Sequence, residues 1–428
     1  EMKAYRLLFF LTLLNLLNFV DRQLIASFAN FIIPELELTN AQFGFLTSLA
    51  FIFFYSIMGL FMGTLADSLN RPKLIAFGVI LWSFFTALTG AAKGFASMAL
   101  PRLFIGVGES ILTPTSMSLL SDSFPSKRLG FASGFYYMGI PLGVGASLLI
   151  VGYLGDSIGW RNCFYLLGAI GVVLGLCTLF FKERPRVHLQ KNTEENKKID
   201  IKSAISTLSV ALRSSPALIY TIAGGVFYHI ALGAAVFEQP WFAEERGFDR
   251  SEIAKIVGYI SVFVGVFGSL VGGFASDWWQ NNTKQGRPMF LFWLSLILLP
   301  IGIIYRFVEP GTAFFWFGVC VGYFQLGCFY GPTFSTVQEL VPLKIRATVV
   351  AFYILSLNLI GLTLGSIGSG IFADVLKSNN YADPYTWTLI IFSIISSLCI
   401  PCYYLAGKKY HEDKDRLEII FKNDATTN

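Results

Sequence analysis

The chain has 428 residues, of which 54% are hydrophobic and only 14% are charged, and its mean hydropathy is +0.61. A soluble domain carries about 25% charged residues, because its surface has to be solvated. This composition therefore excludes a soluble globular protein and indicates a surface that faces hydrocarbon over most of its area. The formal net charge of +5 does not indicate a nucleic-acid partner, because Lys and Arg are concentrated in alternate loops between apolar segments.

Twelve apolar segments follow one another along the chain. A helix of about 20 residues crosses the hydrocarbon core of a bilayer, and only helices or closed barrels satisfy the backbone there. The short alternating segments of barrel strands are absent from the sequence. We therefore predict an all-α polytopic membrane protein with twelve transmembrane helices. The predicted spans are 5–33, 42–66, 74–93, 97–121, 128–154, 160–182, 215–241, 251–276, 288–307, 311–336, 346–373 and 385–407.

The longest polar stretch separates the sixth span from the seventh. It divides the chain into an N-terminal six-helix bundle, 1–182, a cytoplasmic linker, 183–214, a C-terminal six-helix bundle, 215–407, and a cytoplasmic tail, 408–428. Loops on the linker's side of the membrane are rich in Lys and Arg, whereas the opposite loops hold acids such as Glu35. The positive-inside rule therefore places both chain termini in the cytoplasm.

Short motifs recur in the two halves at a nearly constant offset. Residues 113–115, Thr-Pro-Thr, correspond to residues 331–333, Gly-Pro-Thr. Asp67 ends the second span, and Asp277 ends the eighth. Such matches are expected of a parallel repeat, in which two helix bundles are related by an axis along the membrane normal. We therefore predict two pseudo-symmetric six-helix bundles.

The loop after the second span carries a glycine, an aspartate at the end of a helix, and then basic residues. These are Gly63, Asp67, Arg71 and Lys73, and Asp277 is the corresponding acid of the second half. A carboxylate at a helix end attracts Arg or Lys and can thereby stabilise one gate conformation. We predict a gating loop here, with a simple cytoplasmic loop as the alternative. The pattern resembles the loop signature of the major facilitator superfamily.

Three further motifs narrow this resemblance to one family. They are Asn-Phe-Val-Asp-Arg at 18–22, the stretch 102–109 with Gly-Val-Gly before its final acid, and Gly-Trp-Arg at 159–161. Together they resemble the spinster family of the major facilitator superfamily. The resemblance implies the major facilitator fold, alternating-access transport, and a substrate of lysophospholipid or sphingoid-phosphate type with proton coupling. The short loops favour a bacterial homologue, which we expect in the inner membrane as a monomer.

Four charged residues of the first and fourth predicted spans are candidates for a function in transport. Asp21 and Arg22 lie near the middle of the first span. Arg102 and Glu109 lie two turns apart on one face of the fourth span. A charge at the centre of a membrane helix costs about 2.5–3.5 kcal/mol on insertion scales, so it is rarely without function.

In the superfamily that the motifs resemble, the first and fourth helices of each bundle line a central cavity. We therefore hypothesise that Asp21 and Glu109 bind protons, while Arg22 and Arg102 tune these carboxyl groups or bind an anionic headgroup. A static ion-pair network that only fixes helix packing is the alternative.

Neutral polar residues in other spans are further candidates. Those for substrate binding are Tyr136, Gln325, Tyr330 and Asn358. Satisfied polar packing is the alternative for each of them. His229 in the seventh span is either a proton relay or a packed neutral imidazole.

The sequence contains no HExxH or Walker motif, and it holds only three His. We therefore expect neither an enzyme nor a metal site, and no cofactor. The favoured interpretation is a secondary transporter that moves an amphiphilic lipid across the bilayer, coupled to protons. A proton-coupled carrier of small organic anions or of drugs is the alternative.

Overall fold

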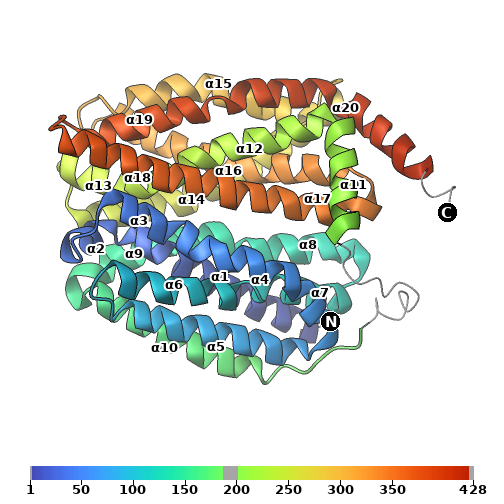
Figure 1. Cartoon of the computed structure of the whole chain (residues 1–428), viewed down its shortest axis with the longest axis horizontal. Coiled ribbons are helices and arrows are strands. Elements are labelled where there is room, and N and C mark those ends of the chain that lie inside the picture. Colours follow the sequence, from blue (N-terminus) through green and yellow to red (C-terminus); the bar gives the residue numbers. More distant parts are fainter. Residues whose placement is uncertain (1, 187–200, 424–428) are drawn as a thin grey trace. The chain divides into compact units, whose positions relative to one another are not determined.

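The computed structural model describes residues 2–186 and 201–423. Over these residues the chain is helical and contains no β-strand (Figure 1). Eleven helical segments of this described part are long and apolar enough to cross a membrane, and Pro288–Ile304 is a shorter apolar helix. The predicted all-α membrane fold is therefore confirmed.

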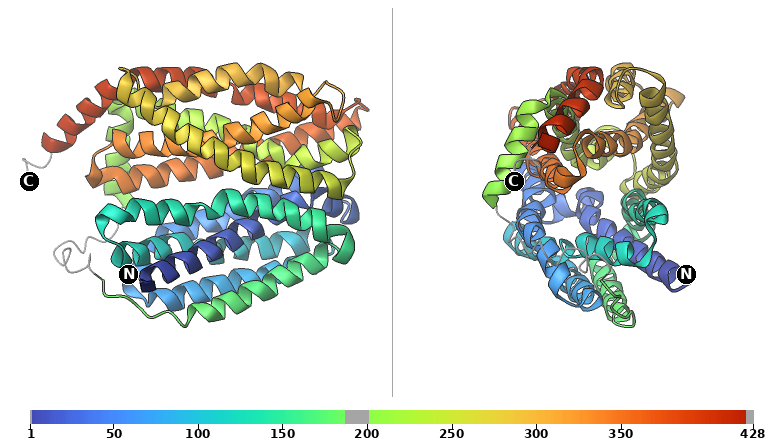
Figure 2. Two further views of the ribbon diagram at one scale, coloured as in Figure 1. Left: turned by 180° about the vertical axis from the view of Figure 1, so that it is seen from behind. Right: turned by 90° about the vertical axis from the view of Figure 1, so that its right-hand side faces the viewer.

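The chain forms two compact units. Unit 1 comprises Glu1–Asn196 and Gln239–Val262, and unit 2 comprises Lys197–Glu238 and Phe263–Asn428. Within each unit the long helices run roughly side by side, so that they are seen nearly end-on in the right-hand view of Figure 2. Unit 1 therefore contains the predicted N-terminal bundle together with a short segment from the second half of the sequence.

Several spans of the first half are divided into two consecutive helices. The helices of this half are α1 (Met2–Ser27), α2 (Ala29–Glu35), α3 (Asn40–Thr47), α4 (Leu49–Ser68), α5 (Arg71–Thr89), α6 (Phe95–Glu109), α7 (Leu112–Ser123), α8 (Ser126–Tyr137), α9 (Gly139–Ile158) and α10 (Trp160–Thr178). The fourth span consists of α6 and α7, and the fifth of α8 and α9. Pro114 and Pro141 lie in the first turns of α7 and α9. Because proline lacks the N–H that would bond to the preceding turn, the helix is interrupted there.

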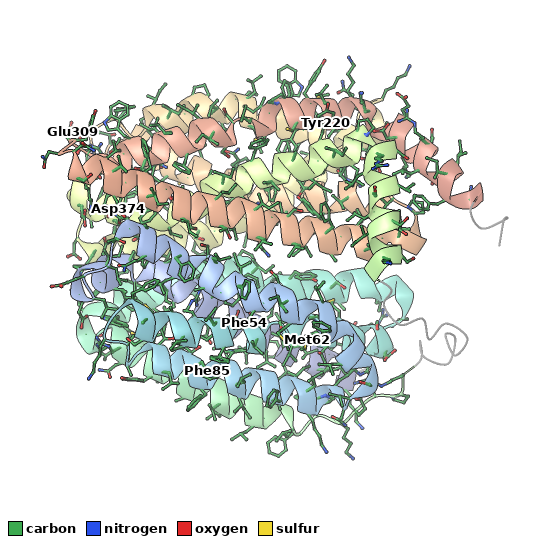
Figure 3. The ribbon with its side chains drawn as sticks, in the orientation of Figure 1. Phe54, Met62, Phe85, Tyr220, Glu309 and Asp374 are labelled. Carbon is green, nitrogen blue, oxygen red and sulfur yellow. The ribbon has the colours of Figure 1, made fainter. Side chains whose placement is uncertain are left out.

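Glycines and phenylalanines both contribute to helix packing in unit 1. Glycines allow close approach of helix backbones, and phenylalanine rings fill the contacts between helices. A Cβ atom at Gly108 of α6 would lie only 2.8 Å from the carbonyl oxygen of Gly78 of α5. Membrane helices depend on such close approach, because lipid supplies no hydrophobic drive for their association. Phe54 of α4 and Phe85 of α5, both labelled in Figure 3, pack against Phe104 of α6. These contacts fix α6, which carries two of the predicted charges, against its neighbours.

The second half is built from longer helices. They are α11 (Ile201–Ser214), α12 (Pro216–Ala234), η1 (Ala235–Phe237), α13 (Glu238–Pro240), η2 (Trp241–Glu245), α14 (Arg250–Asn282), α15 (Pro288–Ile304), α16 (Ala313–Leu340), α17 (Leu343–Leu355), η3 (Ser356–Leu362), α18 (Thr363–Ser378), α19 (Pro384–Ser396) and α20 (Cys399–Asn423). Of these, η2 and η3 are π-helical turns. Such turns widen a helix locally and are frequent at functional sites.

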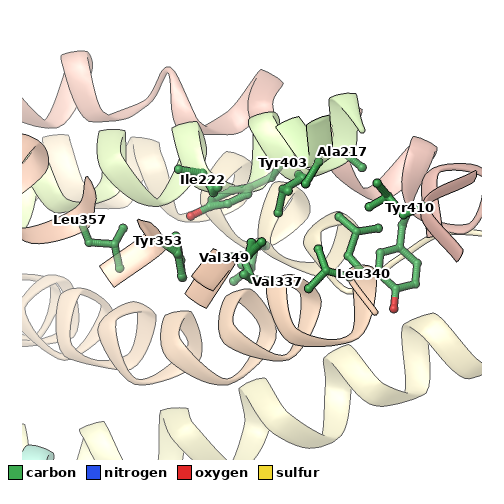
Figure 4. Packing of buried hydrophobic residues seen from close by; sticks show 14 of the residues in the cluster. Ala217, Ile222, Val337, Leu340, Val349, Tyr353, Leu357, Tyr403 and Tyr410 are labelled. Atoms are coloured by element: carbon green, nitrogen blue, oxygen red, sulfur yellow. The ribbon is translucent and has the colours of Figure 1, made fainter. Parts of the chain in front are cut away.

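An apolar core joins α12, α16, α17 and α20 within unit 2 (Figure 4). Tyr353 and Tyr403 are among its almost fully buried members. The helix α11 runs across the other helices (Figure 1), and its Ala211 is completely buried against this core. The linker predicted over 183–214 therefore ends in a helix that packs on unit 2, and its residues 187–200 lie outside the described structure.

The predicted tail, 408–428, begins inside a helix, because α20 runs from Cys399 to Asn423 without interruption. The buried carboxylate of Asp413 accepts hydrogen bonds from the N–H of Ala217 at 2.7 Å and the hydroxyl of Ser215 at 3.3 Å. These groups lie at the N-terminus of α12, where the first N–H groups lack partners within the helix and a negative charge is favourable. The described part of the tail thus belongs to the packed structure of unit 2.

Candidate functional site

The structure brings the four predicted membrane charges together inside unit 1. The Nε of Arg22 on α1 donates a hydrogen bond to Glu109 Oε2 on α6 at 3.2 Å. Asp21 and Arg102 lie close enough to this pair to interact with it electrostatically. Asp21, Arg102 and Glu109 are each at most 2% exposed. The sequence prediction of one polar cluster within the N-terminal half therefore agrees with the geometry.

Helical spacing explains how α1 presents its part of this cluster. Asn18 and Arg22 are four residues apart and so lie one above the other on the helix. The Nη2 of Arg22 donates to Asn18 Oδ1 at 3.1 Å, which holds the guanidinium in position for Glu109. Asp21 projects beside them and accepts a hydrogen bond from the hydroxyl of Thr86 on α5 at 3.2 Å.

Three polar atoms of the cluster have no hydrogen-bond partner among the described residues. Asp21 Oδ1, Glu109 Oε1 and Arg102 Nη2 are buried and unpaired within the described residues. The Nε of Arg102 donates a bond of 3.3 Å to the carbonyl of Leu46. Buried polar groups are normally satisfied, and an unsatisfied one calls for water, a proton or a ligand. These three atoms are therefore the places in the cluster where water, a proton or a ligand would complete the hydrogen bonding.

Aromatic rings enclose the two arginines. The guanidinium carbon of Arg22 lies 4.5 Å from the ring centre of Phe19, 4.7 Å from Phe51 and 4.9 Å from Tyr55. The guanidinium carbon of Arg102 lies 5.2 Å from the same Phe51 ring. Phe51 therefore contacts both cations, and cation–π contacts of this kind contribute about 0.5–2 kcal/mol each. The sequence analysis missed these rings, although Phe51 and Tyr55 are four residues apart and share a helix face.

Tyr136 of α8 lies near Tyr55, whose ring contacts Arg22. Its hydroxyl forms a hydrogen bond of 3.0 Å with Thr113 on α7, and its carbonyl accepts one of 3.0 Å from Asn15. The side chain is completely buried. These bonds join α8 to α1 and α7, so the described contacts of Tyr136 are those of polar packing between helices.

The candidates from the second half have the following contacts in the described structure. Gln325 donates to the hydroxyl of Ser295 at 3.4 Å. The ring of Tyr330 lies 6.0 Å from that of His229, whose Nδ1 is 3.0 Å from the carbonyl of Gly225 in its own helix.

Asn358 lies in the π-helical turn η3 and is half-buried. Its carbonyl accepts a bond of 3.4 Å from the hydroxyl of Thr363. A π-helical turn displaces a backbone group from the regular ladder, and such turns are frequent at functional sites.

The predicted gating loop places Arg71 at the centre of a buried network. Its Nη1 lies 2.5 Å from Asp122 Oδ2 and 2.9 Å from the hydroxyl of Ser118, and its Nε lies 2.8 Å from Glu183 Oε1. Burial alone would raise the pKa of Glu183, but the hydrogen bonds from the backbone N–H and guanidinium of Arg71 outweigh it and lower this pKa. Arg71 thus ties the start of α5 to the end of α7 and to the segment after α10.

The remaining loop residues differ from Arg71. Lys73 is exposed, and its N–H donates to Asn70 Oδ1 at 3.1 Å, which caps the first turn of α5. Gly63 and Asp67 lie in α4, but their side-chain surroundings are outside the described part of the structure. A pairing of Asp67 with a basic residue therefore stays a prediction.

Unit 2 repeats this network. The Nε of Arg287 lies 2.8 Å from Asp277 Oδ1, and its Nη1 lies 2.5 Å from Glu339 Oε2. Arg287 lies directly before α15, and Arg71 is the first residue of α5. Glu339 lies in the last turn of α16, and Asp122 lies in the last turn of α7. Burial works to lower the pKa of Arg287, but the bonds to Glu339 and Asp277 raise it. The sequence analysis named Asp277 but missed Glu339 and Asp122, although the offset of the repeat relates these two acids.

Buried charges within one bundle and arginine–carboxylate networks repeated in both define a polytopic membrane protein of the transporter class. Within the described residues, no three His, Cys, Asp or Glu side chains are placed to hold a metal ion. The chain belongs to the Major Facilitator Superfamily, whose family model matches residues 11–366.

Curated relatives align with large parts of the chain. An MFS-type efflux pump of Mycolicibacterium smegmatis is 27% identical over 414 residues, which cover 94% of this chain and 92% of the relative. A hexuronate transporter of Bacillus subtilis is 26% identical over 66% of each chain. A probable sphingolipid transporter of Arabidopsis thaliana, named as a spinster homologue, is 27% identical over 62% of each chain.

A solved structure shares the whole fold. It is a bacterial homologue of the human lysosomal transporter spinster, in an inward-facing and unoccupied conformation. It superimposes with a TM-score of 0.83 at 24% identity, covering 96% of this chain and 98% of that chain. The resemblance to spinster proteins that the motifs predicted is confirmed. Membership of the superfamily makes this chain an integral membrane transporter and not an enzyme.

Proposed function

We propose that this transporter moves an amphiphilic anion of the lysophospholipid or sphingoid-phosphate type by alternating access, coupled to protons. The observation that carries the proposal is the cluster of Arg22, Arg102, Asp21 and Glu109, with one ion pair formed and three buried polar atoms unpaired. Similarity to spinster proteins supports the lipid class.

The cluster can exchange a proton for an anion. Taking up a proton on Glu109 removes the charge that holds Arg22, and the freed guanidinium can then bind a phosphate or carboxylate group. Arginine suits this role because its planar fork matches both groups with paired hydrogen bonds. The apolar faces of Phe19 and Phe51 beside the arginines suit the carbon chain that adjoins an amphiphile's headgroup. A low dielectric surrounding strengthens each of these interactions.

The orientation in the membrane is part of the proposal. Lys and Arg are concentrated in the loops that contain Arg71, Lys284 and the linker. The positive-inside rule then places both termini in the cytoplasm, in a bacterial inner membrane.

Transport in proteoliposomes tests this function directly. We expect a labelled lysophospholipid to cross the membrane faster with an imposed pH gradient than without one. Glu109→Gln should remove the gradient dependence, because the amide cannot take up the proton. Glu309→Gln is the matched control, since Glu309 is an exposed acid in a loop of unit 2, labelled in Figure 3.

A carrier of small organic anions is the second candidate, favoured by the similarity to a hexuronate transporter. Adding an unlabelled hexuronate to the same assay separates the two. Competition by hexuronate, or gradient-driven hexuronate uptake without lysophospholipid movement, would assign the small anions instead. Well-folded protein that moves neither above the level of empty liposomes would contradict the proposed function.

A further inference from the structure

A second charged site lies in unit 2, and it shares no residue with the cluster of Arg22 and Glu109. Here α16, α17 and the tail part of α20 enclose a cavity of about 390 Å³. Three basic side chains line it, namely Arg346 from α17 and Lys414 and Lys422 from α20. They come from segments that are about 70 residues apart in sequence, so the fold and not a local basic run brings them together.

The cavity carries a surplus of positive charge. Two acids also line it, Glu339 and Glu418. Glu339 interacts with Lys414 but is already held by Arg287 at 2.5 Å and by the amide of Gln280 at 3.2 Å. Arg287, which does not line the cavity, therefore compensates most of the charge of Glu339. Of the lining acids, Glu418 alone is left to balance the three basic side chains.

Arg346 has spare hydrogen-bonding capacity at this place. Its Nη2 makes one long bond of 3.4 Å to the carbonyl of Val341, and its Nε is buried without a partner among the described residues. A guanidinium presents its donors in a planar fork that matches the oxygens of a phosphate group. The buried, unpaired donor is the kind of atom for which a missing ligand is the simplest explanation.

One wall of the cavity is apolar. Val341 is almost fully buried, and Pro342 and Phe421 line the cavity beside it. Phe421 also packs against the core of unit 2. A charged rim over an apolar wall suits a headgroup that is attached to a carbon skeleton. Basic pockets at the cytoplasmic ends of membrane helices commonly bind anionic lipid headgroups.

We propose that this cavity binds a phosphate group, with Arg346, Lys414 and Lys422 as its cationic ligands. The chemistry is that of a phosphate oxyanion, supplied either by the headgroup of an anionic phospholipid or by free phosphate. The site is independent of the proposed transport substrate, because none of its residues belongs to the cluster in unit 1.

Native mass spectrometry of the purified full chain tests the proposal, after titration with phosphatidylglycerol. The test variant is Lys414→Gln/Lys422→Gln, which removes two of the cations from the helical tail. The matched control is Lys408→Gln/Lys409→Gln, which makes the same change of charge on the same helix outside the cavity. Thermal unfolding in detergent establishes that both variants are folded.

We expect the test variant to bind phosphatidylglycerol about tenfold more weakly or worse, since each Lys near a lipid phosphate makes a substantial contribution. The control should bind it within about twofold of the unchanged protein. Diacylglycerol, which lacks the phosphate, should bind equally to all three. Equal weakening in both variants, or no weakening in the test variant, would overturn the proposal.

A parallel titration with inorganic phosphate, read as a shift in unfolding temperature, identifies the source of the anion. Stabilisation that the test variant loses and the control keeps supports a site open to free phosphate. Binding of phosphatidylglycerol without any effect of inorganic phosphate supports a lipid headgroup site. If neither phosphatidylglycerol nor phosphate distinguishes the test variant from the control, the cavity binds no phosphate group.

Discussion

The two units repeat the same network at one end of the bundle and differ at its centre. Arg71 with Asp122 in unit 1 corresponds to Arg287 with Glu339 in unit 2. At the centre, unit 1 places two carboxylates and two guanidiniums, whereas the stretch around Gly327 of unit 2 offers no counterpart to Glu109. Structural symmetry therefore explains the end networks but not the central charges. This difference supports our proposal that the central cluster serves transport, while the end networks stabilise the conformations of the bundles.

The largest effect that we expect is a difference in stability between variants of the two end networks. Arg71→Ala leaves Asp122, which is 4% exposed, without its cation, and breaking a buried ion pair costs about 3–5 kcal/mol. Arg287→Ala frees Asp277 and Glu339, which are 56% and 41% exposed, so water replaces much of the lost interaction and about 1 kcal/mol is expected. Apparent unfolding temperatures in detergent compare the two. A smaller loss for Arg71→Ala than for Arg287→Ala would show that burial does not set the strength of these networks.

A second prediction compares the transport rates of a variant in the central cluster of unit 1 and a variant of a buried histidine in unit 2. Asp21→Asn keeps the hydrogen bond from Thr86 possible but removes a charge from the cluster. We expect gradient-driven transport to fall by about tenfold or more, the equivalent of 1.4 kcal/mol. His229→Gln in unit 2 should change transport by less than about threefold, because the ring is packed against Phe329 and bonded within its own helix. Initial transport rates in proteoliposomes measure the effects of both substitutions. A larger loss for His229→Gln than for Asp21→Asn would indicate that proton binding takes place in unit 2.

The smallest effect concerns pH. Because Arg71 lowers the folded-state pKa of Glu183, the stabilisation from this pair is fully present above the unfolded pKa of about 4.3 and is lost as pH falls below it. The unfolding temperature should therefore decline below about pH 4.5 more steeply in the unchanged protein than in Glu183→Gln. The carboxylate is 26% exposed, so the difference should be modest. Parallel curves for the two proteins over this range would exclude the contribution of Glu183.

Much of the fold was predictable, because the membrane imposes length and hydropathy on each span. The breaks between α6 and α7 and between α8 and α9 were not predicted, although Pro114 and Pro141 mark them. Prolines are common in membrane helices, where neighbouring helices can satisfy the freed backbone groups. A proline in an apolar stretch therefore does not by itself show where a span divides.

The charged members of the central cluster were found from the sequence because charge is rare inside a membrane span. Phe51 was not found, because it is one of 42 Phe in the chain, and only the packing shows which rings meet a guanidinium. Asp122 and Glu183 were missed for a different reason. They lie 51 and 112 residues from Arg71 in sequence, while the motif directed attention to neighbours in the same loop.

The hydrogen bonds of Asp413 connect α20 mechanically to α12 within unit 2. A helix is stiff over its length. In the C-terminal half of α20, Asp413 accepts a hydrogen bond from the N–H of Ala217 in the first turn of α12. Arg416, one turn further, grips the carbonyl of Ser214 at the end of α11. Any tilt of the last membrane helix must therefore carry the first helix of the same unit with it. A protein shortened at Gly407 would lose this mechanical link, even though every membrane-spanning residue remained in place.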